Sequence, residues 1–426
     1  MTTLEELRPW LSDLQGGIVR AHGRTHAHHL FLSFPLSATR ARTWLREFAS
    51  TKISSGWEHL SDARLLDQSF RSVLLTYRGY ERLGMPAPQS EAFRHDMRNR
   101  AEKLNDPPAS KWSQGYQRED IHALVIIAND SRSALTRDVM SFQLEVADAG
   151  IDLVIDEPAT QLFLEGKPIE HFGYADGISQ PLIGGDLIHT RYYRHWDPSA
   201  SRELLLAHEP GASGHFGSYL VFRKLEQNVA RWRQHVEAIS RRTNMDRELV
   251  GALAIGRFRD GQPVLFHGQP RSTGTTVNDF NYDHDAQGLG CPLNAHIRKA
   301  NPRRARPQGS GELVPDRRIV RRGMTYGVRP DLHPQARGLP PPATGVGLLF
   351  MCYQASIEEQ FEHIQAHWMN APHHPMRGAG ADPLAGREGA GLHSPPGKTV
   401  DFGDVIHLLG GGYFFSPSLT FLRSLP

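Results

Sequence analysis

ALVIIANDSRSALTRDVMSFQLEVADAGIDLVI, residues 123–155, holds the pattern that decides the fold. It begins with an apolar run of strand length at 123–128 and continues, over 131–149, with apolar side chains at helical spacing. Gly150 follows at the point where a helix would end, and a second short apolar run, IDLVI, occupies 151–155. The stretch therefore predicts a strand, a helix and another strand.

The residues before this stretch predict the first half of the same unit. We expect strands at 28–34 and 72–77, a helix at 38–49 between them, and an insertion at 78–120 that contains four prolines. The resulting order is strand, helix, strand, strand, helix, strand, which is typical of a ferredoxin-like α+β unit with an antiparallel sheet. We assign this unit to a first domain, residues 1–160.

The second half of the chain repeats this order with longer insertions, and we assign it to a second domain, residues 161–426. The elements expected there are strands at 218–223, 345–353 and 412–415, and helices at 227–241 and 356–369. Ser356 and Glu359 predict a capping box at the start of the last helix. Residues 255–345 are rich in Gly, Pro, Asn and Asp, and loops of such length are often functional. Two related halves would place a shared cleft beside this irregular stretch.

Composition excludes several classes of protein. The chain has 426 residues, with 48 Lys and Arg against 46 Asp and Glu, so its near-neutral charge gives no reason to expect a nucleic-acid or membrane partner. Two cysteines cannot build a disulfide framework or a four-cysteine zinc site. Neither an apolar signal region nor a run of 18 apolar residues is visible, so we expect a cytoplasmic protein.

The 23 histidines make a metal site worth testing, but the visible clusters are weak candidates. His22, His26, His28 and His29 have no Cys, Asp or Glu among them, and neighbouring strand residues point to opposite faces. The pair His363 and His367 occurs in HIQAH, which lacks the general-base Glu of the HExxH motif. Nucleotide-binding glycine loops are absent as well.

Three separated segments offer a better combination of groups. HFGYADGISQP (171–181) holds a carboxylate between glycines, CPLNAHIRKANPR (291–303) holds one imidazole, and IVRRGMTYG (319–327) holds a pair of guanidinium groups. A haem peroxidase can be built from such parts, because imidazole is a suitable ligand for haem iron. A carboxylate can move the proton of hydrogen peroxide between its two oxygens, and a fixed arginine can stabilise the negative charge that develops. No CxxCH motif is present to attach haem covalently.

These segments identify a family resemblance. The chain resembles the dye-decolorizing peroxidases, whose GxxDG motif is matched by residues 173–177. Further segments that match in the same order are LQGGIVRAHGR at 14–24, SYLVFRKLEQ at 218–227, GLLFMCYQ at 347–354 and GGGYFFSPS at 410–418. The resemblance implies two ferredoxin-like domains with noncovalent haem b in the cleft between them.

The same resemblance assigns roles to individual residues. It makes His296 the proximal iron ligand, Asp176 the distal acid and base, and Arg321 the distal arginine. Leu348 and Phe350 are expected to form the apolar wall of the distal pocket. Some family members have Asn or Ser where this chain has a glycine at position 323, and the glycine cannot donate a hydrogen bond. A carboxylate behind the proximal histidine is common in the family, but its position in this sequence is open.

The expected function is reduction of hydrogen peroxide coupled to one-electron oxidation of small organic donors such as dyes and phenols. An alternative is a haem-binding or carrier protein, or a protein that handles haem iron, with little peroxidase turnover. Trp368 and Tyr353 are candidates for relaying electrons from bulky donors to a buried haem, although packing is the simpler role for both. The physiological reductant and the oligomeric state stay open.

Overall fold

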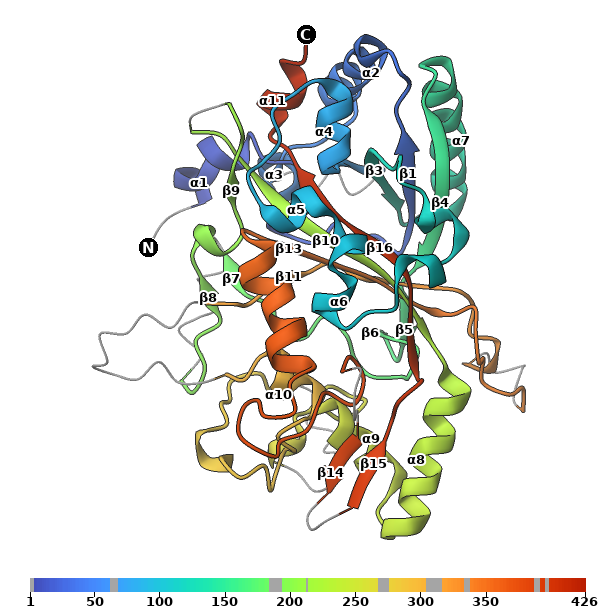
Figure 1. Cartoon of the computed structure of the whole chain (residues 1–426), viewed down its shortest axis with the longest axis vertical. Coiled ribbons are helices and arrows are strands. Elements are labelled where there is room, and N and C mark those ends of the chain that lie inside the picture. The colour runs from blue at the N-terminus through green and yellow to red at the C-terminus, as the bar shows by residue number, and fades with distance from the viewer. Residues whose placement is uncertain are drawn as a thin grey trace.

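Two successive runs of strands and helices form the centre of the molecule in the computed structural model (Figure 1). The structure describes residues 4–61, 68–183, 194–211, 214–266, 276–303, 316–332, 338–386, 391–394 and 398–426. Parts of the irregular stretch predicted at 255–345 lie outside these residues.

The first run has the predicted order and is called the first repeat. It consists of β1 (His26–Ser33), α2 (Ala38–Thr51), β2 (Phe70–Leu75), β3 (Ala123–Asn129), α7 (Arg132–Asp148) and β4 (Asp152–Thr160). Ser131 caps α7 by accepting a hydrogen bond from the Ala134 amide, and Gly150 follows the helix with a φ of 70°. The opening stretch of sequence is thus confirmed as strand, helix and strand.

The second run, called the second repeat, has the same order with its second strand broken in two. It consists of β10 (Phe216–Gln227), α8 (Val229–Thr243), β11 (Val320–Arg321), β12 (Met324–Tyr326), β13 (Gly347–Gln354), the π-helical segments η11 (Ile357–Glu362) and η12 (Ile364–Met369), and β16 (Ile406–Ser416).

Smaller elements occupy the connections and the chain ends. The helices are α1 (Leu4–Leu11), α3 (Gly56–Ser61), α4 (Tyr77–Leu83), α5 (Glu91–His95), α6 (Ala101–Leu104), α9 (Arg247–Ile255), α10 (His296–Ala300) and α11 (Leu419–Arg423). The short strands are β5 (Leu162–Leu164), β6 (Lys167–Ile169), β7 (Leu182–Ile183), β8 (Ser199–Ala200), β9 (Ala207–His208), β14 (Gly391–Ser394) and β15 (Lys398–Asp401). Among the described residues, we find no helix that combines the length and apolar character needed to cross a membrane.

The strands of both repeats join in one sheet, which has ten strands within the described residues. Its main order is β11-β13-β10-β16-β2-β3-β1-β4, so β16 of the second repeat lies beside β2 of the first. Each half has the strand order of a ferredoxin-like unit, and all neighbouring strands along this path are antiparallel. This arrangement is the expected α+β fold. The division into domains 1–160 and 161–426 stays a prediction, although β4 ends at Thr160.

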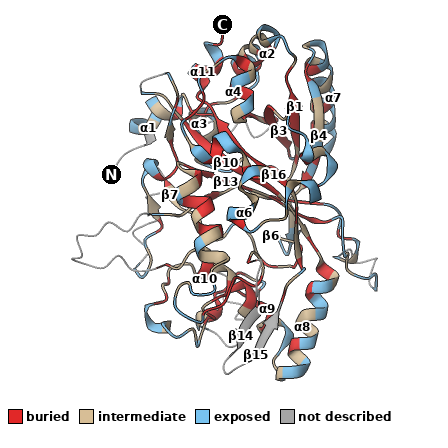
Figure 2. Ribbon diagram, in the orientation of Figure 1, coloured by how far each residue is buried: buried red, intermediate tan, exposed pale blue. Residues whose placement is uncertain are grey.

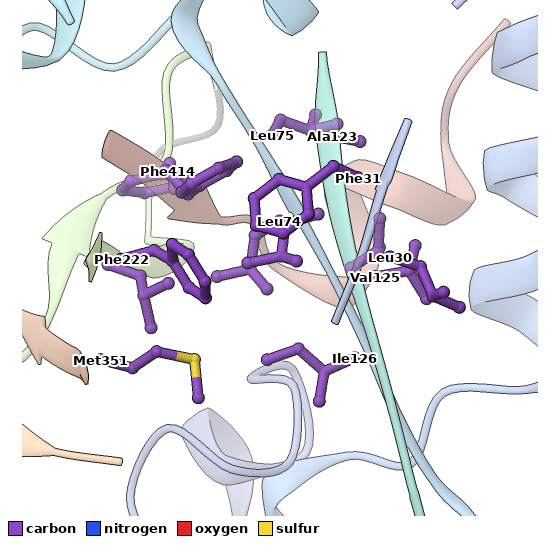
Figure 3. Packing of buried hydrophobic residues seen from close by; sticks show 14 of the residues in the cluster. Leu30, Phe31, Leu74, Leu75, Ala123, Val125, Ile126, Phe222, Met351 and Phe414 are labelled. Atoms are coloured by element: carbon purple, nitrogen blue, oxygen red, sulfur yellow. The ribbon is translucent and has the colours of Figure 1, made fainter. Parts of the chain in front are cut away.

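One hydrophobic core extends across the junction between the repeats. Phe31 of β1 packs edge-to-face against Phe222 of β10 and Phe414 of β16, with ring centroids 5.0 and 6.0 Å apart (Figure 3). The central strands are mostly buried, whereas α7 and α8 expose their outer faces (Figure 2). The repeats are therefore packed as one body around shared aromatic side chains.

The predicted strand at 72–77 was too long at its end. β2 stops at Leu75 because Thr76 begins a helix, its hydroxyl accepting a hydrogen bond from the Gly79 amide at 3.0 Å. The apolar spacing of this segment gave no sign of the cap.

The capping box predicted at Ser356 is only half correct. The Ser356 hydroxyl accepts from the Glu359 amide at 3.2 Å, but the Ser356 amide donates to Gln360 Oε1 and not to Glu359. Glu359 pairs instead with Arg317. The carboxylate prefers a guanidinium partner because the hydrogen bond is then charge-assisted on both sides.

The last strand is longer than the predicted 412–415, because β16 spans Ile406–Ser416 and so includes Gly410 and Gly411 as well. A Cβ atom on Gly410 would lie 2.2 Å from the ring of Tyr116, so only glycine lets that ring pack against the strand. Gly410 is therefore a packing position within the strand.

Candidate active site

A cavity of about 290 Å³ is lined by the connection between the two repeats and by the second repeat with its insertions. All of its described lining residues fall between Glu170 and Ile406, so its walls come from the second predicted domain and not equally from both. The sequence predicted a cleft between two domains, and the structure places the cavity within the second of them. Much of the wall is apolar, and the polar groups stand at a few defined places.

Asp176 and Arg321 line this cavity side by side. The Arg321 guanidinium donates to Asp176 Oδ1 at 3.3 Å and to the carbonyl of Ile178 at 2.7 Å. The Gln180 side chain fixes the backbone of Arg321: it accepts from the Arg321 amide and donates to the Arg321 carbonyl. The carboxylate and the guanidinium are thus held next to each other, each with about a third or less of its side chain exposed.

The loop that presents Asp176 is built around Glu170. The Glu170 carboxylate accepts hydrogen bonds from the amides of Phe172 and Tyr174 at 2.8 and 2.9 Å. Gly173 has a φ of 99°, a conformation that glycine adopts without strain. Burial raises the pKa of Glu170 despite these hydrogen bonds. Glu170 also lines the cavity, and the sequence gave no reason to single it out.

The structure separates the two neighbouring arginines at 321 and 322. Arg322 donates to the carbonyls of Gly17, Ile18 and Val19, so it ties the LQGGIVRAHGR segment to the sheet. Only Arg321 of the pair lines the cavity. A Cβ atom on Gly323 would lie 3.1 Å from the carbonyl oxygen of Leu349, so the position next to the arginines is closely covered by β13.

Leu348 and Phe350 line the cavity from β13. They pair with Leu225 and Arg223 of β10, which line it too, while Leu349 between them is fully buried on the other face. The alternation of a strand therefore places an apolar row on the cavity side.

His296 reaches the cavity from the first residue of α10. Its Nδ1 lies 2.8 Å from Oδ2 of Asp382, a carboxylate with no exposed side-chain surface. Burial alone would lower the pKa of His296, but the charge and hydrogen bond of Asp382 raise it above its ordinary value. This contact leaves Nε2 as the ring nitrogen available to a ligand in the cavity.

Asp382 is the carboxylate that the sequence could not place. Its Oδ1 accepts from the amides of Leu384 and Ala385 at 2.8 and 2.9 Å. Burial would raise the pKa of Asp382, yet the charge and hydrogen bond of His296 and these two amides lower it. The carboxylate is held ionised in a fixed orientation, as in histidine–carboxylate pairs that tune a metal ligand.

The remaining histidine candidates have protein partners of their own. His28 contacts Asp156 at 2.6 Å, and His29, on the opposite face, is buried with its Nδ1 near the carbonyl of Glu157. The rings of His363 and His367 lie 5.0 Å apart. Within the described ranges, no group of three or more His, Cys, Asp or Glu could hold a metal ion.

Neither Trp368 nor Tyr353 is among the residues that line the cavity. Trp368 stacks on His374 with 5.2 Å between ring centroids, and Tyr353 is buried in β13. Their role as electron relays stays a prediction.

Comparison with known proteins decides the family. Residues 197–376 match the family model described as the C-terminal part of Dyp-type peroxidase. The chain is 36% identical to the multifunctional dye peroxidase DyP2 of Amycolatopsis, with 99% of this chain and 97% of the relative covered. The chain belongs to the DyP-type peroxidase family. It is therefore an oxidoreductase that acts on hydrogen peroxide, and DyP-type peroxidases are haem enzymes.

Solved structures of DyP-type peroxidases share the fold. The structure from Anabaena superposes with a TM-score of 0.89 at 34% identity, covering 99% of this chain and 96% of that chain. A further relative in sequence is the dye-decolorizing peroxidase msp1 of Mycetinis scorodonius, which is 27% identical over 77% of this chain and 70% of its own length.

The residues around the cavity fit a haem group. One imidazole, with its Nδ1 engaged by Asp382, is available to iron, and apolar side chains such as Ile297 and Leu384 suit the faces of a porphyrin. The cavity is also lined by three arginines, Arg257, Arg303 and Arg318, whose guanidinium groups suit the anionic carboxylates of haem. Cys291 is not among the lining residues, and burial raises the pKa of its thiol to about 12, so a thiolate ligand is disfavoured.

Proposed function

We propose that this chain binds haem b noncovalently through His296 and uses hydrogen peroxide to oxidise small organic donors such as dyes and phenols. When bound, haem supplies the redox centre that takes oxidising equivalents from peroxide and passes them to the donor. The observation that carries the proposal is that His296, Asp176 and Arg321 all line one cavity. The names of the relatives, which include dye peroxidases, support the donor class.

Asp176 and Arg321 divide the work on peroxide. A carboxylate oxygen of Asp176 accepts the proton from one peroxide oxygen and returns it to the other, which leaves as water. The Arg321 guanidinium stabilises the negative charge on the departing oxygen, and it needs no reorganisation because the Ile178 carbonyl already fixes it. Leu348 and Phe350 exclude bulk water from this part of the cavity.

The ligand assignment is tested with His296→Ala. We expect this variant to lose haem during purification, or to bind it without the absorption spectrum of a histidine-ligated iron. His28→Ala is a suitable control, because it makes the same substitution in β1 of the first repeat and His28 is not a lining residue. A wild-type spectrum in His296→Ala would show that another residue is the ligand.

The haem-carrier alternative is separated by rapid mixing with one equivalent of peroxide. A peroxidase gives a defined spectral change that a phenolic donor reverses, whereas a carrier bleaches. The same experiment with Asp176→Asn should show a slower first step and an unchanged return. The cytoplasmic location expected from the sequence stays a prediction, and the oligomeric state is open.

A further inference from the structure

Lys299 is a fully buried lysine on α10, one helical turn after His296. Its ammonium donates three hydrogen bonds, to the carbonyls of Ala371 at 2.7 Å, His374 at 2.6 Å and Gly380 at 2.9 Å. An ammonium has three protons, so every donor is used. Lysine is seldom buried to this extent unless its charge is satisfied.

The three carbonyls belong to one segment, residues 369–385, which follows η12. The segment closes on itself, since the Asp382 amide donates to the Met369 carbonyl at 2.8 Å and the Gly380 amide to that of Pro372 at 2.9 Å. The Lys299 ammonium contacts the segment at three separated places inside this closure. It acts there as a bound cation would, drawing several carbonyl dipoles toward one point.

Asp382, the partner of His296, lies near the end of this segment. Asn294 donates to the Ala381 carbonyl at 3.1 Å, and Lys299 donates to that of Gly380, so two side chains from the His296 region hold the two residues before Asp382. The His296 Nδ1 contact to Asp382 is the third link between the same two pieces of chain. Moving the segment would therefore move the carboxylate relative to the imidazole.

The charge of Lys299 is maintained near neutral pH. Burial lowers the pKa of Lys299 to about 8, while the Asp382 carboxylate raises it, so the ammonium form predominates at pH 7. An apolar side chain could fill the same space, but it would take the Lys299 donor away from all three carbonyls at once.

We propose that Lys299 is a positioning residue for the iron ligand: its ammonium gathers residues 371–380 and so holds Asp382 against His296. The proposal rests on the proposed role of His296. Asp382 pulls the Nδ1 proton and makes the imidazole a stronger donor to iron, so a displaced Asp382 weakens the iron–imidazole bond.

Lys299→Met in the haem-loaded protein tests this. We expect a lower iron–imidazole stretching frequency by resonance Raman in the ferrous protein and a more positive iron reduction potential. Both shifts should have the direction of those in Asp382→Asn and be smaller.

Arg298→Met is the matched control. Arg298 is the neighbouring residue on α10, has only 4% of its side chain exposed, and bonds to Asp285 and the Cys291 carbonyl on a different part of the chain. We expect Arg298→Met to lose stability without shifting the frequency or the potential. Equal shifts in both variants would reduce Lys299 to a general packing role and overturn the proposal.

Chemical rescue tests the contribution of the Lys299 charge separately from its shape. It also provides a second test if Lys299→Met does not fold. Lys299→Ala removes three carbons and the ammonium, which propylammonium restores. Propylammonium should return the stretching frequency toward the wild-type value, and propanol, of the same shape without the charge, should not. Rescue by both, or by neither, would contradict the proposal.

His296→Ala keeps this test separate from that of the proposed function. If His296→Ala loses the iron–imidazole signal and Lys299→Met retains the wild-type signal, the positioning role alone is wrong. If His296→Ala keeps the signal, the ligand assignment itself is wrong.

Discussion

The two repeats have the same strand order, but only the second repeat contributes residues to the cavity. In the first repeat, β1, β2, β3 and β4 are continuous strands, and none of their residues lines the cavity. In the second repeat, the second strand is broken into β11 and β12, and the connection before it carries His296. The fold tolerates long insertions at strand ends, so function lies where the regular repeat is interrupted.

The break between β11 and β12 shows how an interruption becomes useful. Arg321 pairs with Cys352 and Met324 with Leu349, so Arg322 and Gly323 stand between two short ladders. The strand presents Arg321 to the cavity, and Arg322 turns to the carbonyls of residues 17–19. The corresponding strand of the first repeat, β2, has an unbroken pairing with β3 and offers no such opening.

The largest expected effect tests whether the chemistry belongs to the second predicted domain, which contains Asp176 and the second repeat. Asp176→Asn should lower kcat/KM for hydrogen peroxide by roughly 10²–10⁴-fold, because the amide cannot accept and return the proton. Steady-state assays with a phenolic donor measure this. Asp156→Asn in β4 of the first repeat, an exposed carboxylate paired with His28, should leave the value unchanged. A loss below tenfold in Asp176→Asn would assign the proton transfer to another group.

The next effect tests whether the repeats are energetically separate. Phe31→Ala removes a ring of the first repeat that packs on two rings of the second, and it should lower the free energy of unfolding by about 3–5 kcal/mol. Denaturant titration should still show one transition. Leu144→Ala on α7, where the side chain is 71% exposed, should change stability by less than about 0.5 kcal/mol. Two transitions, with only one displaced by Phe31→Ala, would show independent domains.

A third test concerns Glu209, a carboxylate between the first repeat's insertion and the end of the chain. Tyr80 donates to it at 3.4 Å and the Ser418 amide at 2.7 Å, and burial raises the pKa of Glu209 to about 8. Between the ordinary pKa of a glutamate, about 4.5, and 8, the folded protein holds a proton that the unfolded chain has released. Stability from this group is therefore full below that window and is lost as pH rises through it.

Glu209→Gln should abolish this loss. We expect wild type to lose, relative to the variant, on the order of a few kcal/mol of unfolding free energy between pH 5 and pH 8.5. Denaturant titrations at several pH values give the difference. Buried histidines such as His29 and His122, with pKa values lowered to about 4, affect both proteins alike and cancel. Parallel pH profiles would show that Glu209 is ionised in the folded state throughout.

The sequence predicted the regular parts because their signals are local. The spacing of apolar residues and the Ser131 and Gly150 boundaries were enough for α7, and the motif around Asp176 placed a turn with a carboxylate. Choosing Arg321 over Arg322 relied on the family pattern, and the strand alternation that separates them became visible only in the structure.

The rest depended on contacts between distant residues. Asp382 lies 86 residues from His296 in a glycine-rich segment, and nothing in its own neighbourhood points to the imidazole. The need for glycine at position 410 could not be predicted without Tyr116, whose ring packs there and which comes from an insertion almost 300 positions earlier. Glu170 could not be predicted for the same reason. Its role is to hold the loop around Asp176 through hydrogen bonds that only the folded chain shows.

The smallest expected effect compares equivalent helix starts in the two repeats. Ser131 caps α7 and Ser356 caps η11, each accepting one amide hydrogen bond, so either change to Ala should cost about 1 kcal/mol of stability. Phe361, Ile364 and Gln365 from the η11–η12 segment line the cavity, whereas α7 contributes no lining residue. Ser356→Ala should therefore weaken haem binding as well, by at most about fivefold, and Ser131→Ala should not. Titration of the haem-free variants with haem measures this difference. Equal affinities would mean that the start of η11 is rigid without its cap, so that the cap contributes to stability and not to the site.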